Sequence, residues 1–144
     1  MEKFSQAMVF GGAGLPLEPQ RFTLSELAPG EVLAEVICCT LCGSDLHTFA
    51  GRRQGPAPTI LGHEILGRVV EIGGDGSLSD WNGQPLNIGD RITWSIAASC
   101  GQCFFCERDL PQKCERLFKY GHQATDSASP LSGKSRSQKN TKHT

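Results

Sequence analysis

The sequence predicts a mainly β domain, a compact and mostly antiparallel β-barrel with little helix. Three segments, 31–39, 63–72 and 91–97, are rich in the β-branched and other apolar residues typical of strands. They recur at irregular intervals between glycine turns, and a single short segment, 42–50, has the character of a helix. Strands that do not alternate regularly with helices favour an antiparallel barrel over an α/β fold.

The strand at 31–39 follows the turn signal Pro29-Gly30. Its residues alternate, so one face is expected to pack inward and the other, with Glu31 and Glu35, outward. The expected inward residues are Val32, Ala34, Val36 and Cys38. Cys38 and its neighbour Cys39 are interpreted as strand packing.

The remaining segments are predicted from turn and cap signals. Gly43 or Ser44 is expected near the start of the helix at 42–50. A glycine turn ends the strand at 63–72, residues 77–87 form a loop excursion, and Gly89-Asp90 introduces the third strand. The segment Gly11-Gly12-Ala13-Gly14 predicts a turn. Phosphate binding there is the less favoured alternative, because the segment lacks the G-x-G-x-x-G spacing of a phosphate-binding loop.

The chain divides into a folded domain at 1–126 and a basic tail at 127–144. The tail has one leucine, no aromatic residue, four Lys or Arg and no acid, so it is expected to be disordered. A nucleic-acid-binding tail is the less favoured alternative, since four charges in eighteen residues are thin support.

Composition excludes several classes of partner. The net charge of the 144 residues is −1, which gives no field to attract nucleic acid or anionic lipid. No run of apolar residues reaches the ~18 needed to cross a bilayer, and the N-terminus lacks the features of a signal peptide. A cytoplasmic protein with no nucleic-acid or membrane partner is expected.

The strongest motif is C-x2-C-x2-C-x7-C. This spacing lets four thiolates turn inward on one centre, and a closed four-thiolate tetrahedron is a structural zinc site. An iron–sulfur cluster is disfavoured because the last gap is longer than in that motif, and disulfides are disfavoured in a reducing compartment. The predicted zinc ligands are Cys100, Cys103, Cys106 and Cys114.

A second group of reactive side chains lies upstream in TLCGSDLHTF and ILGHEILGRV. Each has an ordinary explanation by itself. A single histidine beside a strand is more often a core residue than a ligand. Ser44 alone would be a helix cap, and Asp45 alone an acid favoured by the helix dipole. The group as a whole comprises Cys42, Ser44, Asp45, His47, His63 and Glu64.

Taken in order, C-G-S-D-x-H, G-H-E, G-D-R and the four-cysteine segment resemble the N-terminal catalytic domain of the zinc-dependent medium-chain alcohol dehydrogenases. The resemblance runs from about Met8 to Tyr120 and implies a GroES-like, partly open barrel. It also implies an oxidoreductase that converts a small alcohol to an aldehyde or ketone, using zinc and NAD or NADP.

The resemblance assigns roles residue by residue. Cys42 and His63 match two ligands of the catalytic zinc, and Asp45 matches the carboxylate that orients the histidine ligand. Ser44 and His47 match the relay that carries the alcohol proton outward. Glu64 matches an acid beside the metal that is sometimes a transient ligand.

Two expected features are missing from these 144 residues. No nucleotide-binding Rossmann domain follows the barrel, and after Leu131-Ser132-Gly133 the sequence departs from the family, which suggests a truncated product. The third catalytic zinc ligand should follow the cysteine segment, so Glu64, His47 or His122 would have to replace it. Two interpretations stay open: the catalytic domain of an enzyme, or a non-catalytic zinc-binding module. A homo-oligomer, the substrate and the choice between NAD and NADP are undecided by the residues.

Overall fold

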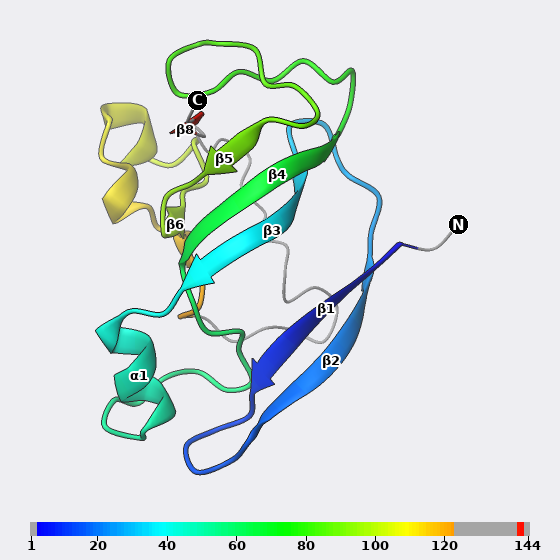
Figure 1. Cartoon of the computed structure of the whole chain (residues 1–144). Helices are drawn as coiled ribbons and strands as arrows, with labels where there is room; N and C mark the ends of the chain where they lie inside the picture. The colour runs from blue at the N-terminus through cyan, green and yellow to red at the C-terminus, as the bar shows by residue number, and fades with distance from the viewer. Residues whose placement is uncertain (1–2, 123–140, 143–144) are drawn as a thin grey trace.

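The computed structural model describes residues 3–122 and 141–142, and this part of the chain is mainly β (Figure 1). Its strands are β1 (Lys3–Phe10), β2 (Leu17–Leu24), β3 (Val32–Thr40), β4 (Glu64–Ile72), β5 (Arg91–Thr93), β6 (Ala97–Ala98), β7 (Phe118–Lys119) and β8 (Thr141–Lys142). One α-helix, α1 (Gly43–Phe49), and two 3₁₀ turns, η1 (Cys106–Arg108) and η2 (Pro111–Lys113), complete the elements of the described residues. The predicted mainly β class with a short helix is confirmed.

The strands form open sheets, and each strand pair in the described residues is antiparallel. The largest sheet has the order β3-β4-β5-β8, while β1 pairs with β2 and β6 with β7. In Figure 1 the helix α1 lies at the end of β3, and the β1–β2 hairpin stands beside the sheet. The hairpin contacts the rest of the chain through a bridge between Phe10 and Thr59.

The core lies on one face of the main sheet. Val69, Leu86 and Ile92 are buried there, with apolar side chains packed around them. Leu86 comes from the predicted loop excursion at 77–87, which therefore contributes to the core as well as connecting two strands.

The β1–β2 hairpin was not predicted, although the turn at 11–14 was. In β1 the large side chains Phe4 and Met8 face outward, while Ala7 and Ser5 lie on the more buried side. The apolar alternation therefore marks the exposed face. Pro19 sits in β2, which a two-stranded hairpin tolerates because one edge needs no ladder hydrogen bonds.

Three further predictions about the strands were wrong. Strand β3 carries register shifts at Leu33/Ala34 and Val36/Cys38, so simple alternation fails and Val36 is 57% exposed. Cys38 and Cys39 are also exposed, which contradicts their interpretation as packing residues. The predicted strand at 91–97 is interrupted after Thr93 and resumes as β6, which turns to pair with β7 instead of β4.

The expected disordered tail at 127–144 lies outside the described residues, apart from Thr141–Lys142, which pair with β5 as β8. No helix in the described part of the chain has the length and apolar character needed to span a bilayer.

Candidate metal centres

The segment between β6 and β7 brings four thiols together. The sulfur atoms of Cys100, Cys103, Cys106 and Cys114 all lie within 4.8 Å of one another. The Cys103–Cys106 and Cys100–Cys106 separations are 3.5 and 4.0 Å. Four thiolates on a tetrahedral zinc with Zn–S near 2.3 Å would stand about 3.8 Å apart, so the sulfurs already have the spacing that this ion requires.

Backbone amides in this segment point at sulfur. The N–H groups of Cys100 and Arg116 donate to Cys114 Sγ at 3.2 and 3.3 Å. Backbone hydrogen bonds, led by that of Gln102, lower the pKa of Cys100 to about 6, and others lower the pKa of Cys103. Burial raises the pKa of Cys106 to about 11. Amides that favour thiolates are the surroundings expected of a metal-binding cluster.

The second group forms where β3 runs into α1. Cys42, Asp45 and His63 have ligand atoms within 4.8 Å of one another. Cys42 is the N-cap of the helix, and Asp45 is the third residue of its first turn. Asp45 Oδ2 accepts the N–H of Cys42 at 3.0 Å, while Cys42 Sγ accepts the N–H of Ser44 at 3.3 Å. The cap is therefore Cys42 and not Ser44 or Gly43.

His63 is placed between the thiol and the carboxylate. Its Nε2 lies 3.3 Å from Cys42 Sγ, and its Nδ1 lies 3.5 Å from Asp45 Oδ2. His63 is 7% exposed and Asp45 1%. At 3.5 Å the Nδ1–Oδ2 contact is an electrostatic one, and Nδ1 has no hydrogen-bond partner among the described residues. A cation held by Sγ and Nε2 would therefore stand on the ring edge opposite Asp45.

The other predicted site residues lie around this cluster. Ser44 Oγ is 2.8 Å from Cys42 Sγ. His47 is exposed, and its Nδ1 accepts a hydrogen bond from Arg52 Nε at 2.9 Å. Glu64 accepts the hydroxyl of Thr40 across the β3–β4 pair at 2.5 Å. The structure thus brings Ser44 to the thiol, whereas the Glu64 carboxylate is engaged on the strand pair.

Histidine 122 lies closer to the cluster than its distance in sequence suggests. Its ring centroid is 4.6 Å from that of His63. Burial, followed by the charges of His63 and Arg53, lowers the pKa of His122. The sequence pattern contained no motif for this contact, because 58 residues separate two histidines that the fold brings together.

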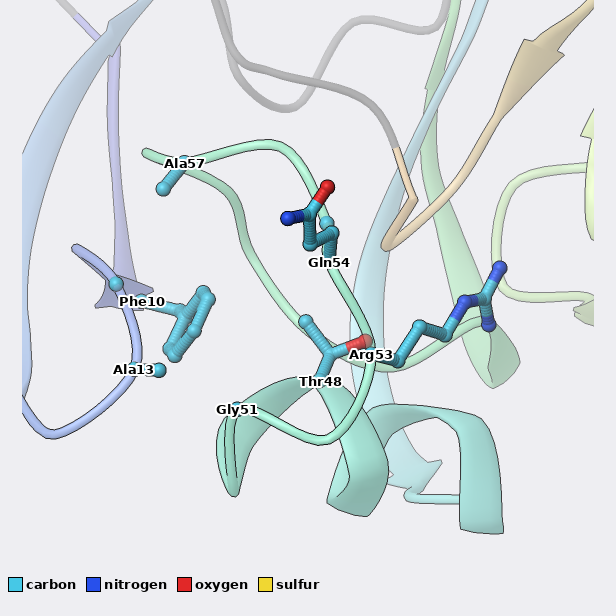
Figure 2. Close-up of a pocket in the computed structure, with 9 residues that line it drawn as sticks. Phe10, Ala13, Thr48, Gly51, Arg53, Gln54 and Ala57 are labelled. Carbon is cyan, nitrogen blue, oxygen red and sulfur yellow. The ribbon is translucent and has the colours of Figure 1, made fainter.

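A pocket of about 320 Å³ lies between the β1–β2 turn, the C-terminal end of α1 and the loop that follows α1 (Figure 2). Phe10 and Thr48 face each other across it, and the Arg53 side chain extends away from Phe10. Neither Cys42 nor His63 lines it. Its wall offers no thiol, imidazole or carboxylate in the described residues, so it is not a third candidate metal centre.

Comparison with known proteins supports this view of the fold. Residues 28–133 match the alcohol dehydrogenase GroES-like domain. A zinc-type alcohol dehydrogenase B of Aspergillus flavus is 33% identical over 99 residues, which are 69% of this chain and 22% of the fungal protein.

Two solved structures extend the comparison. An alcohol dehydrogenase of Thermotoga maritima superposes on 99% of the chain with a TM-score of 0.81 and 32% identity, and 41% of that chain is covered. A structure described as a short chain alcohol dehydrogenase of Escherichia coli complexed with NADH covers 86% of the chain with a TM-score of 0.66 and 25% identity, at 34% of its own length. The chain therefore spans less than half the length of each relative. By its sequence, its mainly β fold and its cysteine segment, the chain belongs to the zinc-type alcohol dehydrogenase family through the GroES-like domain of that family.

Proposed function

We propose that this chain provides the zinc-binding catalytic domain of an NAD(P)-dependent alcohol dehydrogenase that oxidises an alcohol to an aldehyde or ketone. The observation that supports it most directly is the approach of His63 Nε2 to Cys42 Sγ at 3.3 Å in a buried corner. A thiol and an imidazole at this distance can bind one zinc ion together.

Cys42 and His63 would hold the metal, and Asp45 would orient His63. The Asp45 carboxylate is fixed by the N–H groups of Cys42 and Gly62 and faces Nδ1 of the ring. A carboxylate on the far nitrogen holds a ligating imidazole in place and raises its basicity. When bound, zinc supplies Lewis acidity that stabilises the oxyanion of the deprotonated alcohol.

Ser44 and His47 would carry the alcohol proton outward. Ser44 Oγ lies beside the thiol, and His47 lies one turn further along α1 on the exposed side. Since Arg52 donates to Nδ1 of His47, the ring proton of the neutral imidazole resides on Nε2. Glu64 would act as the transient acid beside the metal only after its hydrogen bond with Thr40 breaks.

The four-cysteine cluster would hold a second zinc with a structural role. Four thiolate ligands complete a tetrahedron and leave no position for substrate. We assign this ion to Cys100, Cys103, Cys106 and Cys114 because their sulfurs have the required mutual spacing.

The nicotinamide cofactor and the alcohol belong to the proposal for the whole protein. The Escherichia coli relative was solved with NADH, which supports a hydride acceptor of this kind. We also propose residues 1–126 as the extent of the GroES-like domain, and a reducing compartment such as the cytoplasm, since thiolate clusters persist there. A homo-oligomer remains part of the proposal.

Zinc content separates this function from the alternative of a non-catalytic zinc-binding module. We expect two zinc ions per chain by emission spectroscopy, falling to one in Cys42→Ser. Cys38→Ser, which removes an exposed thiol outside both clusters, should retain two. One zinc per chain in the unmodified protein, lost with the four-cysteine cluster, would favour the module.

The redox step requires its own assay. We expect the zinc-loaded whole protein to reduce NAD or NADP when an alcohol is present, in a screen of primary alcohols and polyols. Cys42→Ser should abolish this activity. No reduction with any of these alcohols in protein that carries both zinc ions would contradict the enzymatic proposal.

A further inference from the structure

His63 has a close neighbour that the roles proposed so far do not use. The ring of His122 lies with its centroid 4.6 Å from that of His63 and its plane tilted by 39°. Two imidazoles that bind one tetrahedral zinc at Zn–N distances of 2.0–2.1 Å have centroids about 5 Å apart. The two rings thus have nearly the centroid separation of a pair of zinc ligands. His122 is not among the residues here whose ligand atoms all lie within 4.8 Å of one another, so its side chain would have to turn toward Cys42 to share a metal.

A backbone contact between two glycines holds His122 at this place. A Cβ on Gly121 would come within 2.7 Å of the carbonyl oxygen of Gly62. Both glycines have positive φ angles, +70° for Gly121 and +99° for Gly62, which other residues adopt at a cost. The residues that follow these two glycines are His122 and His63, so the close backbone approach sets their rings against each other.

The other candidate donors near the cluster are engaged elsewhere. The Nδ1 of His47 accepts from Arg52, and Glu64 accepts from Thr40. Asp45 has an oxygen within 4.8 Å of Cys42 Sγ, but its carboxylate already receives two backbone N–H groups and faces Nδ1 of His63. Of the three residues that could complete the set, only His122 packs against a ligand.

We propose that His122 is the third protein ligand of the metal bound by Cys42 and His63. The inference rests on the proposed zinc site and specifies its donor set. One thiolate and two neutral imidazoles leave a formal charge of +1 on a zinc centre and one tetrahedral position open, as catalytic zinc sites require. A ring contact that serves packing alone is the competing explanation.

The test is a Co²⁺ and Zn²⁺ titration of the full chain, with metal affinity measured by competition with a chelator. Co²⁺ reports the donor set through its absorption bands, and the four-cysteine cluster serves as an internal reference for folding. We expect His122→Ala to weaken the metal at Cys42 by more than about 100-fold, because a lost ligand should exceed the 10–100-fold cost of a lost outer partner. His47→Ala removes a histidine of α1, the helix that Cys42 caps, and should leave the affinity within about threefold of wild type, below that outer-partner cost.

A second variant at position 122 tests the inference independently of His122→Ala. His122→Cys should retain two metals and add sulfur-to-cobalt charge-transfer intensity. Two metals in the wild type, with unchanged affinity and spectrum in His122→Ala, would overturn this inference and leave the proposed function intact. Charge-transfer intensity that does not increase in His122→Cys would also overturn it. A wild-type chain that binds metal at the four cysteines alone would overturn both.

Discussion

Asp45 and His63 face each other in the interior, with Oδ2 3.5 Å from Nδ1, although 17 residues of chain separate them. The carboxylate reaches this position because the first turn of α1 places it under the cap residue Cys42. It also accepts the N–H of Gly62, which directly precedes His63. One buried side chain therefore fixes both the helix that carries the thiol and the loop that carries the imidazole.

Asp45→Asn should weaken the metal at Cys42 and His63 by about 10–100-fold, as is typical of a lost outer partner. The amide can no longer accept from both backbone N–H groups, so the free energy of unfolding should fall by about 1–3 kcal/mol. Chelator competition and urea denaturation measure the two effects. Asp75→Asn changes an exposed carboxylate that bonds to Ser77 and should leave metal affinity unchanged. Equal effects of the two variants would refute the orienting role.

Removal of metal should destabilise the cysteine segment. We expect a strong chelator to lower the thermal midpoint, since the binding free energy of a structural zinc is also folding free energy. Each kcal/mol lost corresponds to about 2–8 °C in a domain of this size. Cys114→Ser should lose one zinc and reproduce the shift in thermal midpoint, because it removes one of the four clustered thiols. It also removes the sulfur to which two backbone amides donate. Cys38→Ser provides the control, and an unchanged midpoint after complete zinc removal would contradict the structural role.

Gly121→Ala should lower the free energy of unfolding by more than an equally strained glycine substitution elsewhere in the chain. Gly121 and Gly83 have similar φ angles, +70° and +79°, so an alanine pays a similar backbone cost of about 1–2 kcal/mol at each. Nothing lies within 4 Å of a Cβ on Gly83, whereas a Cβ on Gly121 meets Gly62 at 2.7 Å. We expect Gly121→Ala to exceed Gly83→Ala by more than about 1 kcal/mol in urea unfolding. Similar losses would mean that the Gly62 contact relaxes without cost.

The loop at 77–87 should prove part of the core. Leu86 is 3% exposed and packs with Val69 and Ile92, so Leu86→Ala should cost about 2–5 kcal/mol. Leu15→Ala, at a leucine that is 55% exposed in the β1–β2 turn, should stay within about 0.5 kcal/mol of wild type. Differential calorimetry of both variants measures the contrast. A small loss at Leu86 would show that the loop detaches readily from the sheet.

Short-range patterns in the sequence were sufficient to predict the parts of the molecule that local chain geometry controls. The spacing of Cys100, Cys103, Cys106 and Cys114 predicted a four-thiol cluster because two-residue gaps turn successive side chains toward one centre. The helix after Cys42 and the strand after His63 were predicted within one or two residues. The outward-facing aromatic and methionine side chains of β1 concealed the hairpin, and the bulges of β3 reversed the expected exposure of Val36.

The sequence by itself determined the class of fold, the cysteine cluster and the identity of the candidate ligands in the second cluster. Tertiary structure alone decided which of those groups meet: it set His122 against His63, engaged Glu64 with Thr40, and left Cys38 and Cys39 exposed. The physical reason is the distance along the chain over which a sequence pattern can act. Spacing along the chain governs contacts within a few residues, whereas the approach of Gly121 to Gly62 depends on how separate strands and turns pack around a common core.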